Sequence, residues 1–386
     1  MKCFYFSLRY LVVLILAALA QAQTFTTLYK FTGGADGGNP EAGVIQDAEG
    51  NLYGTTQDSG VYKAGVVYEI STAGTETVLH SFGSGQDGLS PFTPVIRDGK
   101  GNIYGTTVEG GSDDYGTIFT IDATGHETIL HSFGTIKDDG CYPEQGLVMG
   151  KSGILFGTAA KCGSHNRGTI FKVNSAGHFT LLYSFIQSPY GGRPAGGRLT
   201  RDKSGSLYGV TTGGGHNEGV LYELAANGAP GLLHSFMGGT KDGCYPVGSV
   251  MQDEAGNFYG TTYDCGSNGY GTIWKVSKTG REIILHNFSG GTADGCYPSG
   301  GVARDLEGNL YGVASECGAN GYGALYEFSA SGTFTLLHSF GLSDGADPVG
   351  EVLWTNGTLF GTTYVGGNDG CNAYGNGCGT VWSYVP

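Results

Sequence analysis

Short apolar stretches recur along the whole chain and alternate with glycine-rich polar segments. Each stretch is four to seven residues long, is rich in β-branched and aromatic side chains, and is bounded by Gly, Asn, Asp or Pro. Such runs are typical of strands joined by tight turns. No window has the sustained 3.6-residue period of an amphipathic helix. The pattern therefore predicts an all-β protein.

The strand pattern is itself repeated. The motif Leu-Tyr-Gly-Thr-Thr, or a close variant, begins at Leu52, Ile103, Leu155, Leu207, Phe258, Leu310 and Leu359, so that successive copies lie 49 to 52 residues apart. Each unit contains four apolar stretches, the last of which reads Leu-Leu-His-Ser-Phe or similar. A period of this length with four strands per unit predicts a seven-bladed β-propeller with four antiparallel strands in each blade.

The two ends of the chain are out of phase with this unit. Residues 24–31 match the fourth strand, whereas residues 379–384 match the third. We expect the N-terminal strand to complete the last blade, because closing the ring in this way leaves no unpaired strand edge at the seam. Residues 23–386 are therefore predicted to form a single propeller domain.

The first 22 residues have the features of a secretory signal peptide. Lys2 and Arg9 precede an apolar run from Tyr10 to Leu19, and Ala20-Gln21-Ala22 supplies the small-residue cleavage site. The apolar run is about half of the roughly 20 residues needed to cross a bilayer. No hydrophobic tail precedes Pro386. We expect an exported, monomeric chain without membrane insertion, located in the periplasm, at the cell surface or outside the cell.

The charge balance bears on partners. The chain has 34 acidic and 20 basic side chains and a formal net charge of −14, which repels the phosphates of nucleic acid. Its 73 glycines lie at turn positions between apolar strands, so the composition indicates a turn-rich folded protein. Neither a phosphate-binding loop nor a Gly-x-Ser-x-Gly motif is present, and no cofactor is predicted.

Six cysteines fall into three pairs, each with a separation of 21 residues. The pairs are Cys141 with Cys162, Cys244 with Cys265, and Cys296 with Cys317. Repeats that lack one member of the pair also lack the other, which indicates that the two positions touch. In an exported propeller these loops share one rim, so we predict three disulfides within blades. Cys371 and Cys378 are predicted to form a fourth bridge. The cysteines have neither Cys-x-x-Cys spacing nor a neighbouring histidine, and no metal site is predicted in the chain.

Repeated polar residues provide candidates for function. The histidines of the fourth strand lie at the outer edge of different blades and are interpreted as structural hydrogen-bonding residues; they are His80, His131, His234, His286 and His338. Along the first strand, Glu41, Glu144 and Glu351 could approach the central channel. A pair such as Glu41 and Glu144 could act as acid and base in glycoside hydrolysis, although a solvated rim is the alternative.

A second candidate is the rim that carries the cysteines. Its loops present tyrosines and short polar side chains, namely Tyr142, Tyr245, Tyr270, Tyr297, Tyr322, Asn268, Asn320, Asp242 and Asp294. A tyrosine ring can hold the C–H face of a sugar while amides and carboxylates bind its hydroxyls. The structural alternative is that these sequences are simply good turns with tyrosines covering the disulfides.

Gly-Asn-Leu-Tyr-Gly-Thr-Thr, Gly-Thr-Ile-Phe and Leu-His-Ser-Phe together resemble the GloVer tandem repeat of exported bacterial proteins. The resemblance covers the predicted mature chain and implies a secreted or surface-attached repeat protein without an established activity. We therefore expect a binding or scaffold module, with glycans or cell-surface components as partners. The alternative is a polysaccharide lyase or hydrolase with its site at the channel mouth.

Overall fold

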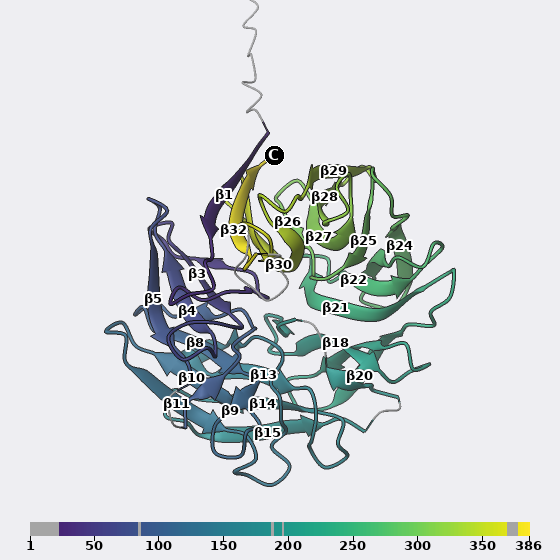
Figure 1. The fold of residues 1–386 in the computed structure, drawn as a ribbon. Coiled ribbons are helices and arrows are strands. Elements are labelled where there is room, and N and C mark those ends of the chain that lie inside the picture. The colour runs from purple at the N-terminus through teal and green to yellow at the C-terminus, as the bar shows by residue number, and fades with distance from the viewer. Residues whose placement is uncertain (1–22, 84–85, 187–188, 195–196, 369–376) are drawn as a thin grey trace, which may run out of the picture.

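The computed structural model describes residues 23–83, 86–186, 189–194, 197–368 and 377–386. The predicted signal peptide, residues 1–22, lies outside these ranges. In the described residues the strands form seven small antiparallel sheets around a central axis, which confirms the seven-bladed propeller (Figure 1). No helix in these ranges has the length and apolar character needed to cross a membrane.

The blades follow one another in chain order. Blade 1 contains β2 (Ile45–Gln46), β3 (Leu52–Thr56), β4 (Val66–Ile70) and β5 (Glu76–Ser81). Blade 2 contains β7 (Ile96–Arg97), β8 (Ile103–Thr107), β10 (Thr117–Ile121) and β11 (Glu127–Ser132), with β6 (Gly88–Leu89) paired to β9 (Glu109–Gly110). Blade 3 contains β12 (Val148–Met149), the 3-10 turn η1 (Lys151–Gly153), β13 (Leu155–Ala159), β14 (Thr169–Val173) and β15 (Phe179–Ser184).

Blade 4 contains β16 (Gly192–Pro194), β17 (Thr200–Arg201), β18 (Leu207–Gly213), β19 (Val220–Leu224) and β20 (Pro230–Ser235). Blade 5 contains β21 (Gly243–Gln252), β22 (Phe258–Cys265), β23 (Thr272–Val276) and β24 (Glu282–Asn287). Blade 6 contains β25 (Gly295–Pro298), β26 (Ala303–Arg304), β27 (Leu310–Cys317), β28 (Ala324–Phe328) and β29 (Phe334–Ser339). Blade 7 contains β30 (Ala346–Thr355), β31 (Thr358–Val365), β32 (Thr380–Val385) and β1 (Thr24–Lys30).

The ring closes through strand pairing between the two ends of the chain. β1 pairs antiparallel with β32, with Thr24 opposite Val385 and Lys30 opposite Thr380 (Figure 1). The N-terminal strand thus becomes the fourth strand of blade 7, as predicted from the phase of the repeats.

The innermost strands are more broken than the repeat pattern predicts. Only β21 and β30 run for ten residues, whereas the corresponding strands in blades 1, 2 and 3 have two. Backbones meet near the axis: a Cβ added to Gly43 would lie 2.1 Å from the carbonyl oxygen of Glu351, and one on Gly300 would lie 1.9 Å from that of Gly350. Only glycine fits at these close approaches of the inner segments.

A glycine–proline contact joins each blade to the next on the same side of the ring. Gly65 precedes the third strand of blade 1 with a φ of +90°, and a Cβ there would lie 2.6 Å from Cδ of Pro91 in blade 2. The carbonyl of Gly65 also accepts a hydrogen bond of 3.0 Å from the N–H of Phe82. The same contact recurs between Gly116 and Pro143, Gly168 and Pro194, Gly219 and Pro246, Gly271 and Pro298, Gly323 and Pro348, and Gly379 and Pro40.

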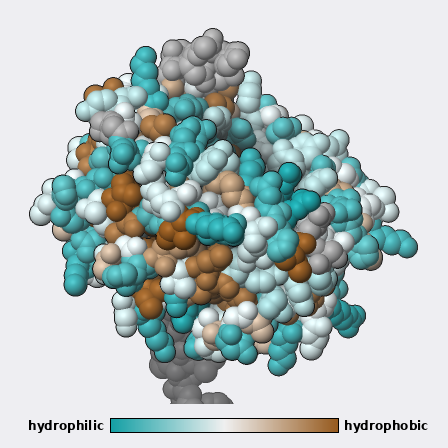
Figure 2. Space-filling view, turned by 90° about the horizontal axis from the view of Figure 1, so that it is seen from below, coloured by the Kyte–Doolittle hydropathy of each residue, from teal (hydrophilic) through white to brown (hydrophobic). Residues whose placement is uncertain are grey.

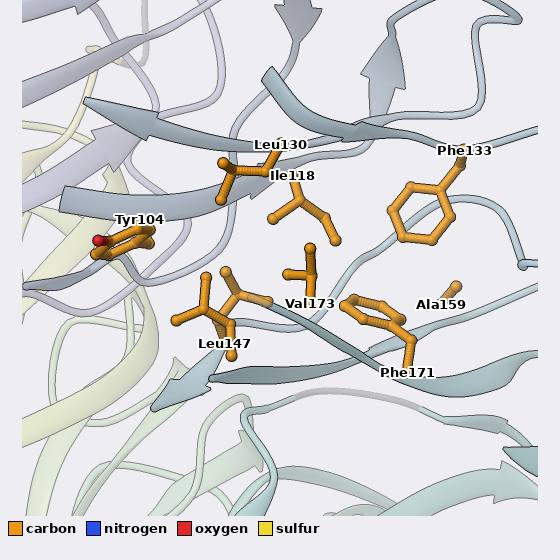
Figure 3. Close-up of a cluster of buried hydrophobic side chains, with 9 residues drawn as sticks. Tyr104, Ile118, Leu130, Phe133, Leu147, Ala159, Phe171 and Val173 are labelled. Atoms are coloured by element: carbon orange, nitrogen blue, oxygen red, sulfur yellow. The ribbon is translucent and has the colours of Figure 1, made fainter. Parts of the chain in front are cut away.

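Aromatic rings fill the space between neighbouring blades. Phe82, which follows the fourth strand of blade 1, packs edge-on against Phe119 of blade 2 with 5.1 Å between ring centroids. Between blades 2 and 3, Phe133 and Ile118 meet Leu147, Phe171 and Val173 (Figure 3). The third-strand aromatics therefore pack blade against blade. From the circumference, apolar side chains form separate patches among hydrophilic ones (Figure 2).

The repeated motif is explained by hydrogen bonds as well as packing. The hydroxyl of Tyr53 donates to Asp47 in the preceding hairpin at 2.8 Å, and that of Thr55 donates to the carbonyl of Thr93 in the next blade at 3.0 Å. Equivalent bonds to the next blade join Thr106 to Pro143, Thr261 to Gly300, and Thr362 to Ala42. The aspartate of each of these Asp-x-x-Gly-Asn hairpins thus has a structural role.

The three predicted disulfides are confirmed. Cys141–Cys162, Cys244–Cys265 and Cys296–Cys317 are bonded, with Cα separations of 5.4, 5.4 and 5.5 Å. Such bridges fit an exported protein, because disulfides persist in oxidising compartments. The fourth predicted bridge involves Cys371, which lies outside the described residues.

Four of the five outer-strand histidines hydrogen-bond to an aspartate, in agreement with their predicted structural role. The distance from histidine Nε2 to aspartate Oδ2 is 3.0 Å for His80 and Asp87, 2.9 Å for His131 and Asp139, 3.2 Å for His286 and Asp294, and 2.9 Å for His338 and Asp344. Each aspartate belongs to the loop that leads into the next blade, so these pairs hold that loop against the outer strand.

We predict that the glycine–proline contact is needed for stability. A Cβ at Gly271 would lie 2.3 Å from the carbonyl oxygen of Thr262 and 2.7 Å from Cδ of Pro298, so Gly271→Ala should lower the free energy of unfolding by roughly 3 kcal/mol. Gly269 in the same loop has a φ of +78° but no atom within 4 Å of an added Cβ. Gly269→Ala should cost only about 1 kcal/mol. Equal losses in guanidinium unfolding of the oxidised variants would contradict a steric role for Gly271.

Candidate functional site

The antiparallel order of the strands separates two kinds of loop. The loops between second and third strands and the connections between blades lie on one face of the disc, and the short hairpins lie on the other. We call the first the loop face. It carries the disulfides and all seven glycine–proline contacts.

The residue before each of these prolines has left-handed backbone. The φ angles are 59° at Asn39, 55° at Ser90, 56° at Tyr142, 56° at Arg193, 53° at Tyr245, 57° at Tyr297 and 53° at Asp347. A residue before proline ordinarily prefers extended backbone, so sequence reasoning does not predict this conformation. The N–H of each residue donates to the preceding blade; Tyr297, for example, donates to the carbonyl of Tyr270 at 3.0 Å. The seven side chains therefore arise from equivalent places on the loop face.

Three tyrosines come together between blades 5 and 6. Tyr297 stacks on Tyr263 with 5.1 Å between ring centroids and meets Tyr270 edge-on at 5.6 Å. Tyr270 and Tyr297 are among the residues predicted from the sequence, whereas Tyr263, which is 38% exposed, is not. Its signal is the position directly after Tyr-Gly-Thr-Thr, where Tyr364 stands in the last repeat.

Next to these tyrosines is a cavity of about 270 Å³ between blades 6 and 7. We call it the blade 6–7 cleft; it is lined by Ser315, Glu316, Gly321, Tyr322, Leu342, Ala346, Asp347 and Val365. The hydroxyl of Ser315 donates to the carbonyl of Tyr297 at 2.9 Å, which links the cleft to the stacked rings. Burial, and then the nearby Glu316, raises the pKa of Asp347 to about 6.

The other predicted rim residues differ in their positions and contacts. Tyr245 is 43% exposed on blade 5, whereas Tyr142 lies apart in blade 3, edge-on to Tyr115 at 5.9 Å. The amide nitrogens of Asn268 and Asn320 donate to the backbone carbonyls of Phe288 and Phe340, each at 3.1 Å, and so brace their own loops.

Asp242 and Asp294 do not belong to the exposed rim, which corrects the expectation from the sequence. Both are buried, and Asp294 accepts hydrogen bonds from Ser289 and Gly295 and pairs with His286. The turn-like sequence around each aspartate concealed that its side chain points back into the blade.

The predicted carboxylates do reach the central channel. A cavity of about 220 Å³ at the channel mouth is lined by Glu41, Glu144 and Glu351, together with Phe92, Gln145 and Ser299. Glu351 of blade 7 is fixed by an ion pair of 2.8 Å with Arg198 of blade 4 and by the hydroxyl of Ser249 in blade 5. Glu41 and Glu144 are thus the carboxylates of this cavity that have no such ion pair in the described residues.

The electrostatics of the channel mouth favour protonated carboxyls. Burial, and then the nearby Asp347, Asp58 and Glu144, raise the pKa of Glu41 to about 7. Burial also raises the pKa of Glu144, although Lys161 and Arg193 oppose this shift. A carboxyl that exchanges its proton near neutral pH can serve as a hydrogen-bond donor, an acceptor or an acid–base group.

Two groups of side chains in the described residues have spacings that suit a metal ion. One contains Glu218 with Cys244 and Cys265, but the two sulfurs are bonded to each other and are not available as thiolates. The other contains His234, Asp242 and Glu282 at the outer edge between blades 4 and 5.

Comparison with known proteins identifies the family. The Gloeobacter/Verrucomicrobia repeat matches residues 15–159 and 144–382, so the chain belongs to this repeat family and the resemblance noted in the sequence is confirmed. No curated protein matches the chain in sequence.

Several solved structures share the fold. A streptogramin B lyase has 11% identity and a TM-score of 0.61, with 94% of this chain and 97% of the lyase covered. The extracellular domain of a putative hybrid two-component system from B. thetaiotaomicron has 10% identity and a TM-score of 0.59, with 94% of this chain but only 41% of that chain covered. A puromycin hydrolase has 12% identity and a TM-score of 0.55, with 86% and 51% covered. At these identities the likeness shows the propeller fold alone.

We predict that Glu41 makes stability depend on pH. The folded protein holds the proton of Glu41 more tightly than the unfolded chain does, so this stabilising contribution is lost as the pH rises from about 4.5 to about 7. Glu41→Gln cannot ionise. Its unfolding free energy relative to wild type should therefore rise by on the order of 2 kcal/mol between pH 4.5 and pH 8. Exposed Glu49→Gln is the control, and a parallel rise in that variant would contradict the assignment.

Proposed function

We propose that this chain is an exported binding module for extracellular carbohydrate. In this proposal the glycan lies in the blade 6–7 cleft and contacts the tyrosines beside it. The observation that carries the proposal is the stack of Tyr263 on Tyr297 next to a cavity with two carboxyls, Glu316 and Asp347.

This combination of groups suits a sugar. An exposed aromatic ring provides an apolar surface for the C–H face of a pyranose, and carboxyls beside it exchange hydrogen bonds with the hydroxyls. Tyr322 lines the same cleft and is 40% exposed. The acidic character of the cleft favours a neutral or cationic glycan over an anionic one.

The loops that carry these side chains are fastened by covalent bonds. Tyr245 and Tyr297 each follow a disulfide-bonded cysteine, Cys244 and Cys296. A loop that is already ordered loses little conformational entropy when a ligand binds, so the bridges support binding without adding contacts of their own.

Export supports an extracellular ligand. The three disulfides fit an oxidising compartment, and the fold recurs in the extracellular domain of a putative hybrid two-component system.

A polysaccharide hydrolase or lyase is the second candidate, because Glu41 and Glu144 share the cavity at the channel mouth. With a pKa of about 7, Glu41 could act as the general acid or base while Glu144 supplies the partner carboxylate. Release of shortened glycan that is abolished in Glu41→Gln would favour this activity, whereas binding without turnover would favour the binding module.

We predict that the stacked tyrosines are required for binding. Tyr263→Ala and Tyr297→Ala should each weaken the affinity for glycans bound by the wild-type protein at least about tenfold, because each removes one of the two stacked aromatic rings beside the cleft. The measurement is a glycan array followed by calorimetry with the best ligand. Tyr62→Ala is the control, since Tyr62 is 54% exposed but belongs to blade 1.

Two results would contradict a carbohydrate site in the blade 6–7 cleft. If the wild-type protein binds no glycan on the array, or if Tyr263→Ala and Tyr297→Ala retain full affinity while folding normally, the blade 6–7 cleft is not a carbohydrate site.

A further inference from the structure

At the outer edges of the blades a histidine–aspartate pair recurs, and the pair of His234 and Asp242 differs from the others. The ring of each outer-strand histidine faces a residue near the start of the fourth strand in the next blade. At three of these contacts that residue is a phenylalanine stacked on the imidazole, with 4.1 Å between the centroids of His131 and Phe179, 4.0 Å for His286 and Phe334, and 3.8 Å for His338 and Phe25.

At two other contacts the phenylalanine is replaced by glutamate. Glu127 takes this position opposite His80, and Glu282 takes it opposite His234. His80 nevertheless keeps its hydrogen bond of 3.0 Å to Asp87. Blade 2 thus provides a carboxylate in the same place without disturbing the histidine–aspartate pair.

Only at His234 does the pair open. Nε2 of His234 lies 3.8 Å from Oδ2 of Asp242 and 3.4 Å from Oε2 of Glu282. Neither distance is a hydrogen bond by the usual 2.7–3.2 Å range. Nε2 of His234 and Oε1 of Glu282 are both buried atoms without a hydrogen-bond partner in the described residues. The oxygen of Glu282 that faces Nε2 is Oε2, and Oε1 of Glu127 is also without a partner in this part of the chain, so the feature particular to this contact is the unpartnered Nε2 of His234 beside two carboxylates. A buried polar atom without a partner indicates a missing group, such as a water molecule or an ion.

The spacing fits a metal ion. Zinc binds imidazole nitrogen and carboxylate oxygen at about 2.0–2.2 Å, which places tetrahedral ligand atoms about 3.3–3.5 Å apart. The available atoms of His234, Asp242 and Glu282 all lie within 4.8 Å of one another, and the His234–Glu282 distance is 3.4 Å. Two carboxylates and a neutral imidazole also match the double charge of the ion.

The surroundings hold at least one ligand in place. Oδ2 of Asp242 accepts a hydrogen bond of 2.7 Å from the N–H of Met237, and Oδ1 accepts one of 2.7 Å from the N–H of Gly243. Bonds of this kind orient a ligating carboxylate.

We propose that His234, Asp242 and Glu282 form a zinc-binding site, with a water molecule as fourth ligand. The site joins three segments: the outer strand β20 of blade 4, the loop between the blades, and the outer strand β24 of blade 5. The ion would fasten blade 4 to blade 5 at the place where the histidine–phenylalanine stack is absent. This site is independent of the carbohydrate cleft and of the channel mouth.

Zinc itself is the probe for testing the site. The oxidised wild-type protein, stripped with a chelator, should bind one Zn²⁺ per chain in calorimetry, and its unfolding temperature should rise with the zinc concentration. Glu282→Gln and Asp242→Asn should each weaken zinc binding at least tenfold and remove the thermal shift. Glu127→Gln is the matched control, because it changes the equivalent glutamate between blades 1 and 2 and should leave both readouts at wild-type values.

Two results would overturn the proposal. One is a wild-type protein whose unfolding temperature does not respond to zinc, which would show that a charged imidazole between two carboxylates holds the blades together. The other is binding that survives equally in Glu282→Gln and Glu127→Gln, which would assign the ion to exposed histidines elsewhere. Circular dichroism of the zinc-free variants establishes that loss of binding is not loss of fold.

Discussion

The fit of a proline ring against a glycine backbone in the preceding blade is the contact on which the propeller depends. At Gly379 and Pro40 this contact joins the two ends of the chain, and a Cβ on Gly379 would lie 2.6 Å from Cδ of the proline. A side chain in place of the glycine would push the blades apart at the loop face. The aromatic rings that fill the space between blades can be exchanged among Phe, Tyr and Trp, whereas each glycine has no substitute of equal size.

The same contact creates the candidate site. The residue before each proline must bond to the loop of the preceding blade, and it does so with left-handed backbone. Its backbone is therefore committed to the fold while its side chain is free to differ, so Tyr297 and Asp347 can occupy equivalent positions in neighbouring blades. Function can vary around the ring without a change in architecture.

The apolar packing between blades is interrupted at a few positions where carboxyl groups are buried. On the loop face, burial raises the pKa of both Glu41 and Asp347, and the nearby Asp347 adds to the shift at Glu41. At the circumference, Glu282 replaces the phenylalanine that stacks on histidine elsewhere, and its buried oxygen has no partner in the described residues. A buried carboxyl costs free energy unless a proton, a ligand or an ion compensates it, so each such position is a sign of binding or chemistry.

The sequence by itself determined the repeat count, the four strands per blade, the ring closure and three disulfides. It could do so because these features are periodic: a register of 49 to 52 residues, a shift in phase at the termini and paired substitution of cysteines are all visible along one dimension. It also indicated that Glu41 and Glu144 could approach the channel, since equivalent residues of inner strands converge on the axis, but it left a solvated rim as the alternative.

The tertiary structure alone decided which polar side chains meet. Tyr263 stacks on Tyr297 across a blade boundary, Arg198 reaches Glu351 across the ring, and His234 opens away from Asp242 toward Glu282. The sequence separates these residues by 34 to 153 positions in the first two cases and offers the same local pattern at His80 and His234 in the third. Contacts between blades depend on differences in distance of a few tenths of an ångström. The packing of neighbouring sheets determines these differences, and no local sequence pattern contains them.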